Sequence, residues 1–415
     1  MTTGPSEDAA GSVYSEPSFS AKLTASSHFS RRALVEALQG RRPLLDADPE
    51  SIPHDLHLSA GATWLKNSIE ACGGQASSKA YRFPRGWMPP YPETTGYIIP
   101  TLLNLGDVAG DKVFEEMALR LGRWLTTIQR QDGGFSGYEL GSGQDADVFD
   151  TGMILLGFNA LQHRARDPEI GQAAARAAAF LRSAMDDDGA FVRHVSHDML
   201  HTYNVRSAWA LIAHGTMESD QQSVDAGMKN VDWTLSQQRS NGFFENNGFK
   251  PGGNANTHGT AYVLRGLLQV HLLTHRQDIL DAVLQAAVAV RDRFEAEGWL
   301  ASELGRNWEF RSRHVCLTGC AQLAIVFFRL AALTKDLAFI APAERLIAQV
   351  AVTQTIKNHT AVDYGGIAGS YPIFGAYAPL QYPNWATKFM VDALLVRKQW
   401  HESKETMTDR DLWAG

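Results

Sequence analysis

The sequence predicts an all-α fold, an (α/α)6 toroid of about six helical hairpins. Two observations support this prediction. Apolar stretches with helical spacing fill the chain from residue 62 onward, and no convincing run of alternating strand residues interrupts them. In addition, two sequence marks recur along the chain with a period of about 56 residues. Such a repeat is typical of stacked helical hairpins, because one hairpin cannot bury its apolar face alone.

Each repeat contains an apolar helix that opens on two small residues. The pairs are Thr95-Gly96, Thr151-Gly152, Ser207-Ala208, Thr260-Ala261, Thr318-Gly319 and, less clearly, Ala386-Thr387, and their second members are 56, 56, 53, 58 and 68 residues apart. The stretch "TGMILLGFNAL" (151–161) is apolar nearly all round, which is typical of a helix buried on every side. We expect these helices to form the inner layer, where small residues let neighbouring helices approach closely.

The partner helix of each repeat is amphipathic. Residues 114–129 have apolar positions 114, 117, 118, 121, 124, 125 and 128 on one stripe. Each partner helix is followed by a turn that combines glycine with an aromatic residue. These glycines are Gly134, Gly189, Gly242, Gly298 and, more loosely, Gly365. We expect the amphipathic helices to be outer, with the glycines as left-handed C-caps. A closed ring is preferred to an open solenoid, because the C-terminus shows no polar capping repeat.

The chain divides into four parts. Residues 1–27 are rich in Ser, Ala, Gly and Pro, which predicts a disordered tail. Residues 28–60 are predicted to form an N-terminal helical extension, and residues 61–402 the toroid domain. Residues 403–415 are predicted to form a C-terminal tail.

Composition limits the classes of partner. A net charge of −7 argues against a nucleic-acid partner, which would require a basic footprint. No apolar run reaches the length of about 18 residues that predicts a membrane span. The N-terminus has no apolar signal-peptide region, so the expected location is cytoplasmic. The three cysteines do not make a disulfide framework, no metal site or cofactor is predicted, and the oligomeric state is left open.

Polar and aromatic residues gather just before the expected inner helices. The segments are 91–96, 145–152, 201–208, 254–261, 311–319 and 382–388. In a toroid all inner helices begin at the same end, so these segments are expected to meet at one mouth. Some members are explained as helix N-caps. Capping does not explain the cationic side chains there, because helix N-termini already carry positive potential. Their presence indicates an anionic, hydroxyl-rich ligand.

Four residues are predicted to be catalytic: Glu93, Asp150, Tyr203 and His258. The predicted substrate-binding residues are the aromatic and polar members of the same segments: Tyr91, Phe149, Asn204, Arg206, Arg313, His314, Tyr382, Asn384, Trp385 and Lys388. Glu93 and Asp150 begin neighbouring repeats and fit acid/base work on a glycosidic bond. The alternative is proton abstraction beside a uronate carboxylate by His258, His314 or Tyr203, with Arg206 or Arg313 holding the developing charge.

Four stretches carry a resemblance to a known family. They are "GWMPPYPETTGYIIPTLL", "VFDTGMILLGF", "VCLTGCAQLAI" and "GGIAGSYPIFGAYAPLQYPNWATKFMVDALL". At these stretches the chain, from about Trp64 to Trp400, resembles bacterial polysaccharide-biosynthesis proteins of the (α/α) toroid type. The wider toroid group includes six-hairpin glycosidases, polysaccharide lyases, uronyl epimerases and terpenoid cyclases.

The resemblance and the residues together favour an enzyme of exopolysaccharide biosynthesis. It would act on a glycan, or on a sugar-containing small molecule, by hydrolysis, elimination or epimerisation at the mouth of the toroid. Two alternatives stay open. One is a non-catalytic glycan-binding or assembly protein, and the other is a terpenoid-cyclase-like or prenyl-binding protein.

Overall fold

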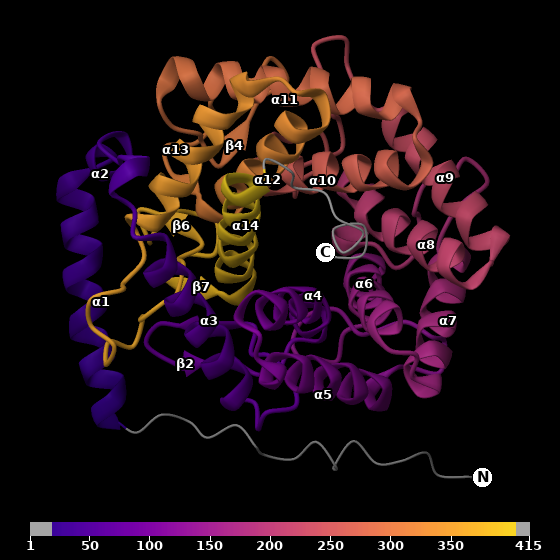
Figure 1. Cartoon of the computed structure of the whole chain (residues 1–415), viewed down its shortest axis with the longest axis horizontal. Helices are drawn as coiled ribbons and strands as arrows, with labels where there is room; N and C mark the ends of the chain where they lie inside the picture. Colours follow the sequence, from indigo (N-terminus) through magenta and orange to yellow (C-terminus); the bar gives the residue numbers. More distant parts are fainter. Residues whose placement is uncertain (1–18, 404–415) are drawn as a thin grey trace.

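Six helices form a closed inner ring in the computed structural model, which describes residues 19–403 (Figure 1). Each inner helix packs on the next, and the last packs on the first. In chain order they are α4 (Pro92–Ala109), α6 (Val148–Arg164), α8 (Val205–Glu218), α10 (Thr257–Thr274), α12 (Leu317–Thr334) and α14 (Asn384–Ser403). The predicted (α/α)6 toroid is therefore confirmed.

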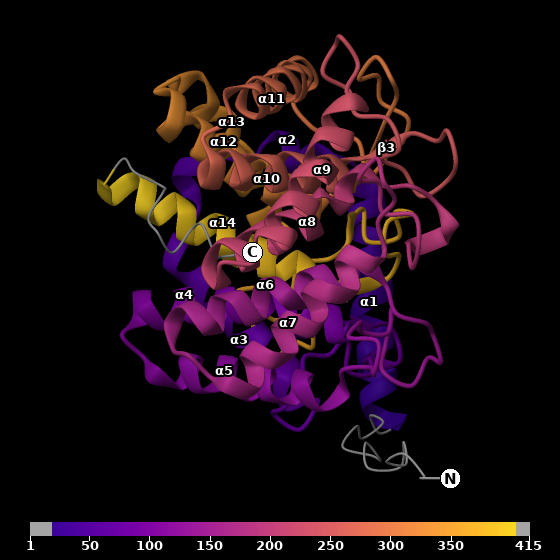
Figure 2. The ribbon, with the colours of Figure 1, turned by 90° about the vertical axis from the view of Figure 1, so that its right-hand side faces the viewer.

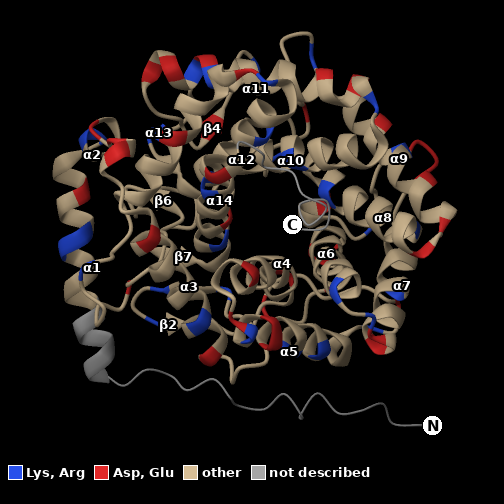
Figure 3. Cartoon of the chain, in the orientation of Figure 1, with Lys and Arg blue, Asp and Glu red and all other residues tan. Residues whose placement is uncertain are grey.

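An outer layer of helices surrounds this ring. The helices α5 (Lys112–Ile128), α7 (Pro168–Ser183), α9 (Gln221–Ser236), α11 (Gln277–Glu297) and α13 (Ile340–Ala351) each pack on the inner helix that precedes them in the chain. The sixth outer position belongs to α3 (His54–Glu70), which packs on α14. The first and last parts of the toroid thus complete one hairpin between them. Among the described residues, Lys, Arg, Asp and Glu lie mainly on the outer helices and turns (Figure 3).

The N-terminal part of the chain lies outside the ring. It comprises α1 (Phe19–Gln39), α2 (Arg42–Leu45) and the short 3-10 helix η2 (Pro49–Ser51). Residues 1–18 of the predicted tail, and residues 404–415 at the C-terminus, lie outside the described residues. Residues 19–27 belong to α1 and not to a disordered tail, so that boundary was wrong. The toroid also begins at His54, earlier than predicted, because all of α3 packs on α14.

The small pairs act as predicted at the contacts between inner helices. A Cβ added at Gly96 would lie 2.5 Å from the Cα of Ile154 on α6, and one at Gly152 would overlap Ser207 on α8. The threonines of two pairs have a second role. The Thr95 hydroxyl accepts a hydrogen bond from the amide of Ser77 at 3.0 Å, and the Thr151 hydroxyl accepts one from Phe135 at 3.0 Å. In these two repeats the threonine of the pair therefore also stabilises the turn that precedes the inner helix.

One of the turn glycines caps its helix as predicted, and another has a different role. Gly298 is the left-handed C-cap of α11, with φ of 74°. Gly189 also has positive φ, but α7 already ends at Ser183. A Cβ on Gly189 would lie 2.5 Å from the carbonyl carbon of Lys229 on α9. The C-cap prediction was thus wrong for Gly189, where the absence of a side chain lets the turn pack on the backbone of the next outer helix.

Short strands fasten the segments before the inner helices. The strands β1 (Ala80–Arg82), β2 (Gly86–Trp87) and β7 (Gln381–Pro383) form an antiparallel sheet in the order β2-β1-β7, in which Tyr81 pairs with Tyr382. Two further pairs join β3 (Ala255–Asn256) to β4 (Glu303–Leu304), and β5 (Val315–Cys316) to β6 (Ser370–Tyr371). The long connections gather at one side of the ring, opposite the C-terminal end of α14 (Figure 2). These strands were not predicted, because two or three residues are too few to show an alternating pattern.

The helix α12 is long and apolar enough to cross a membrane by length and composition alone. However, 89% of that window is buried inside the molecule. Its character is that of an inner helix of the toroid, which is surrounded by other helices on all sides.

Candidate active site

Glu93 and Asp150 come together at the mouth of the ring. Glu93 lies in the first turn of α4 and Asp150 in the first turn of α6, and the two side chains are 6% and 5% exposed. Tyr91, at the N-cap of α4, donates its hydroxyl to Asp150 Oδ1 at 3.3 Å and also hydrogen-bonds the Glu93 carboxyl. One phenol therefore links the two predicted catalytic carboxyls.

A third carboxylate, Asp147, stands beside this pair and was not among the predicted site residues. It is the N-cap of α6 and accepts hydrogen bonds from the amide of Phe149 at 2.7 Å and from Ser196 Oγ at 2.7 Å. These donors identify it as a capping group. Its charge nevertheless acts on the carboxyl group of Asp150.

The electrostatics of the cluster favour protonated carboxyls. Burial raises the pKa of Glu93 to about 7, although the hydrogen bond from Tyr91 and the charge of Lys79 oppose the change. Burial also raises the pKa of Asp150 well above its ordinary value, and the nearby Asp147 and Glu93 raise it further. Neighbouring carboxylates in a poorly solvated site cannot all ionise together. Burial therefore favours the protonated form of both carboxyls, and at neutral pH Glu93 is close to its midpoint.

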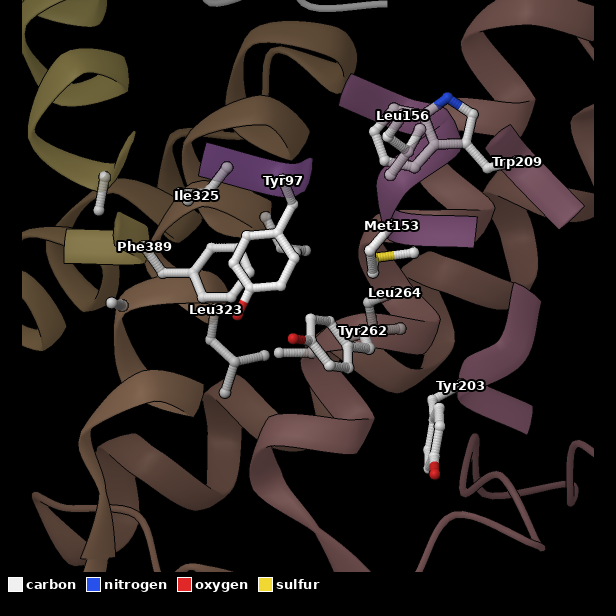
Figure 4. Close-up of a cluster of buried hydrophobic side chains, with 14 of the residues drawn as sticks. Tyr97, Met153, Leu156, Tyr203, Trp209, Tyr262, Leu264, Leu323, Ile325 and Phe389 are labelled. Atoms are coloured by element: carbon white, nitrogen blue, oxygen red, sulfur yellow. The ribbon is translucent and has the colours of Figure 1, made fainter. Parts of the chain in front are cut away.

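Aromatic side chains pack around the carboxyls and between the inner helices. Phe149 packs edge-on against Tyr203 at 5.3 Å between ring centroids and lies 5.0 Å from Tyr262. Tyr97, Tyr262 and Phe389 converge from α4, α10 and α14 (Figure 4). Burial raises the pKa of Tyr203 well above its ordinary value, so its phenol is neutral.

A glycine-rich connection adds another aromatic residue to the site. Trp385 Nε1 donates to the hydroxyl of Tyr377 at 3.0 Å, and the Tyr377 ring lies 5.5 Å from the ring of His258. Trp385 is also 6.5 Å from Tyr91 by ring centroids. The long sixth repeat thus brings the loop before α14 against the predicted site.

The hydrogen bonds of His258 determine its tautomer. Arg265 Nη1 donates to Gln322 Oε1 at 3.3 Å, which turns the amide nitrogen of Gln322 toward His258 Nδ1 at 2.8 Å. Because an amide nitrogen can only donate, Nδ1 accepts, and the ring proton lies on Nε2. Burial, together with the charges of Arg206 and Arg265, lowers the pKa of His258 to about 3. His258 is therefore a neutral hydrogen-bond donor, and it is not arranged as the base considered from the sequence.

Two predicted residues lie deeper than the carboxyls. Lys388 Nζ donates to Asp392 Oδ2 at 2.6 Å, and Arg206 lies 4.7 Å from the Tyr262 ring. Both side chains are completely buried. Asn204, at the end of the 3-10 helix η4 (Thr202–Asn204), is also buried and does not cap α8 with its side chain.

Four predicted residues have contacts outside this cluster. Tyr382 donates its hydroxyl to Asp363 at 2.8 Å, and Asn384 Oδ1 accepts from Trp64 Nε1 at 2.8 Å. These groups join the N-terminal helices to the C-terminal loop. Arg313 is exposed, and its carbonyl accepts from Arg41. The carbonyl of His314 accepts from the Ser302 amide at 2.8 Å, and burial lowers the pKa of its half-buried imidazole. The structure therefore does not place these four among the carboxyls.

Several site residues were missed although their spacing could have revealed them. Tyr97, Tyr262 and Asp392 each follow a predicted residue by four positions, and Arg265 follows His258 by seven. Those spacings place side chains on one face of a helix. Within residues 19–403, no group of three or more His, Cys, Asp or Glu side chains is arranged to hold a metal ion.

No protein-family model and no curated protein match the chain. Solved structures share its fold. An unsaturated glucuronyl hydrolase specific for heparin is 16% identical, with a TM-score of 0.67, over 88% of this chain and 98% of that one. The unsaturated glucuronyl hydrolase of Bacillus sp. GL1 is 16% identical, with a TM-score of 0.67, over 85% of this chain and 98% of that one. A polysaccharide lyase is 13% identical, with a TM-score of 0.62, over 84% and 97%. At these identities the likeness establishes the shared toroid.

Proposed function

We propose that this protein is a carbohydrate-active enzyme that hydrolyses a glycosidic bond in an acidic glycan or glycan intermediate. The observation that carries the proposal is the buried pair Glu93 and Asp150, joined through the hydroxyl of Tyr91. Glycosidic hydrolysis needs one carboxyl that is protonated and another that is ionised. Burial raises the pKa of both carboxyls, and Glu93, whose pKa is about 7, is present in both forms near neutral pH.

The two carboxyls take different roles in this proposal. Asp150, whose protonated form is favoured by burial and by the neighbouring Asp147 and Glu93, donates its proton to the leaving glycosidic oxygen as the bond to the anomeric carbon breaks. Glu93 accepts a proton from the water whose oxygen forms the new bond to that carbon. His258 Nε2–H and the neutral phenol of Tyr203 are donors available to sugar hydroxyls. Aromatic rings such as Phe149 provide apolar faces for a sugar ring.

Hydrolysis is favoured over elimination or epimerisation because those reactions need a base that abstracts a carbon-bound proton. His258 Nδ1 already accepts from Gln322, and its other nitrogen carries the proton. Tyr203 would have to ionise against the effects of its burial and of neighbouring carboxylates. His314 lies outside the cluster. None of the three predicted bases is arranged for that step.

An acidic substrate agrees with the cations of the interior and with what similar structures act on. The similar hydrolase from Bacillus sp. GL1 is described as responsible for the degradation of glycosaminoglycan. In this chain Arg206 lies near Glu93 and raises the local positive potential. A role in exopolysaccharide biosynthesis, and a cytoplasmic location, stay predictions from the sequence.

The test measures product release from acidic oligosaccharides, including ones with an unsaturated uronyl end and saturated controls. Glu93→Gln and Asp150→Asn are expected to abolish turnover, and isothermal titration calorimetry should show that both variants keep the glycan affinity of the wild type. Tyr138→Phe, at the exposed rim, is the matched control and should remain active. Binding without turnover by the wild-type protein on every substrate would instead support the glycan-binding alternative. A terpenoid-type function would require an apolar interior, whereas Arg206, Arg265 and Lys388 lie in this one.

A further inference from the structure

The interior of the toroid, below the carboxyls, contains buried cations from three different helices. Arg206 comes from α8, Arg265 from α10 and Lys388 from α14. Their side chains are 0%, 3% and 0% exposed. A buried charge is costly unless an opposite charge or strong hydrogen bonds compensate it. The stability of these buried cations therefore depends on which carboxylates lie close enough to balance their charge.

The nearest carboxylate at this level, Asp392, is already engaged. Its Oδ2 accepts from Lys388 Nζ at 2.6 Å, and its Oδ1 accepts from the Thr101 hydroxyl at 2.7 Å. Asp392 therefore balances the charge of Lys388. Glu93 lies above and contributes only part of a charge, since its pKa is raised to about 7. Arg206 and Arg265 form no direct ion pair with a carboxylate among the described residues, although the charge of Asp392 acts on both.

These two guanidinium groups also have unused donors. Arg206 contacts Met153 Sδ at 3.4 Å through Nε, but Nη1 and Nη2 have no hydrogen-bond acceptor in the described part of the chain. Arg265 donates from Nη1 to Gln322, and its Nε has no acceptor there either. Both lie beside the same ring, with guanidinium carbons 5.9 Å and 5.1 Å from the centroid of Phe389. Both guanidinium groups therefore lie near the same aromatic ring, and the charge of Arg206 acts on Arg265.

The two positive charges destabilise each other. Burial lowers the pKa of Arg265 well below its ordinary range, and the charge of Arg206 lowers it further. Arginine nevertheless stays protonated in proteins, so the charge has to be compensated and not lost. Aromatic faces attract a cation, but they accept no conventional hydrogen bond from the unused N–H groups.

We propose that a small inorganic anion, such as chloride or phosphate, binds inside the toroid between Arg206 and Arg265. The anion accepts from the unused guanidinium donors and adds negative charge that Asp392 and Glu93, which form no direct ion pair with these groups, supply only in part. The anion takes no part in the proposed hydrolysis, although Arg206 also acts on the charge of Glu93. Its role is to stabilise the inner ring where α8 and α10 meet.

The test measures thermal unfolding of the full chain after exchange into a buffer without chloride or phosphate. Added sodium chloride or inorganic phosphate should raise the Tm saturably, by about 3 °C for a domain of this size at a 100-fold excess over the Kd. Arg206→Met should abolish this dependence. Arg164→Met, which removes an arginine from a partly exposed surface pair with Asp107, is the matched control and should keep it.

Four results would overturn the proposal. They are a Tm that does not saturate with either anion, an equal response in Arg206→Met, a response to glucuronate alone, and a response that appears only after residues 404–415 are removed. The last result would show that acidic residues of that segment, such as Asp409 or Asp411, balance the charges. Crystals of the wild-type protein soaked in bromide give a test that needs no variant. An anomalous peak between Arg206 and Arg265 is expected. Its absence would refute halide binding at this place. If phosphate also had no effect on the Tm, the proposal itself would be refuted.

Discussion

Replacing Tyr91 by phenylalanine tests how the two carboxyls are controlled. The change removes one hydroxyl and keeps the ring, which lies 5.1 Å from Lys79 Nζ and 6.5 Å from the ring of Trp385. In the wild-type protein that hydroxyl hydrogen-bonds both Glu93 and Asp150, and it lowers the pKa of each. Its loss therefore raises both pKa values.

The size of the effect follows from the strength of one shared hydrogen bond. A hydrogen bond to a charged group contributes about 1.5–3 kcal/mol, and one pKa unit corresponds to about 1.4 kcal/mol. Because Tyr91 divides a single donor between two carboxyls, each receives roughly half of that energy. We expect the pKa of Glu93 to rise by about one unit, from about 7 to about 8.

The assay is the pH dependence of kcat/KM on an acidic oligosaccharide that the wild-type protein cleaves. The acidic limb of the profile reports ionisation of Glu93, the proposed base, so Tyr91→Phe should move that limb to higher pH by about one unit. Tyr138→Phe is the matched control. Tyr138 contacts Asp150 through its backbone amide, at 3.2 Å, and this contact survives the change. An unmoved acidic limb in Tyr91→Phe, with a uniformly lower rate, would refute the assignment of Glu93.

Three further predictions concern other parts of the molecule. Gln322→Glu should raise the pKa of His258 from about 3, because a carboxylate favours the imidazolium, and NMR of the imidazole nitrogens would show whether it does. Gly152→Ala should destabilise the protein by about 3 kcal/mol in chemical unfolding, since its Cβ would overlap Ser207. Gly141→Ala, whose Cβ would meet nothing within 4 Å, should cost about 1 kcal/mol, and equal losses would contradict the packing argument. Finally, a carboxyl whose pKa is raised from 4.5 to about 7 binds its proton more tightly in the folded state. The stability this adds is complete below the unfolded pKa, so wild-type Tm should fall between about pH 4.5 and 7 by more than that of Glu93→Gln.

The architecture could be predicted from the sequence because two marks, the small pair and the turn glycine, recur with the same period. The small pair reports where inner helices touch, and the turn glycine reports where a turn packs on the next outer helix. Glu93 and Asp150 could be named because inner helices of a toroid begin at one end. The role of α3 could not be predicted, since its partner α14 lies more than 300 residues away along the chain.

The limits of prediction at the site have a physical cause. His258 was considered as a base because its residue type titrates near neutrality. Its tautomer, however, depends on Gln322 and Arg265, which approach it only in the folded ring. Tyr382 and Asn384 were predicted to bind substrate from their position before α14. Both are instead engaged by polar groups of the N-terminal part of the chain, Arg32 and Trp64.

The pairing of α3 with α14 has a consequence for synthesis on the ribosome. The outer helix at residues 54–70 leaves the exit tunnel more than 300 residues before its partner at residues 384–403. Until then the apolar face of α3 lacks the helix α14 on which it packs, and nascent chains with such exposed apolar surface are targets for chaperones. A circular permutant that begins at Gly252, in the exposed loop between the α8/α9 and α10/α11 hairpins, would let these helices emerge in succession and should depend less on such assistance.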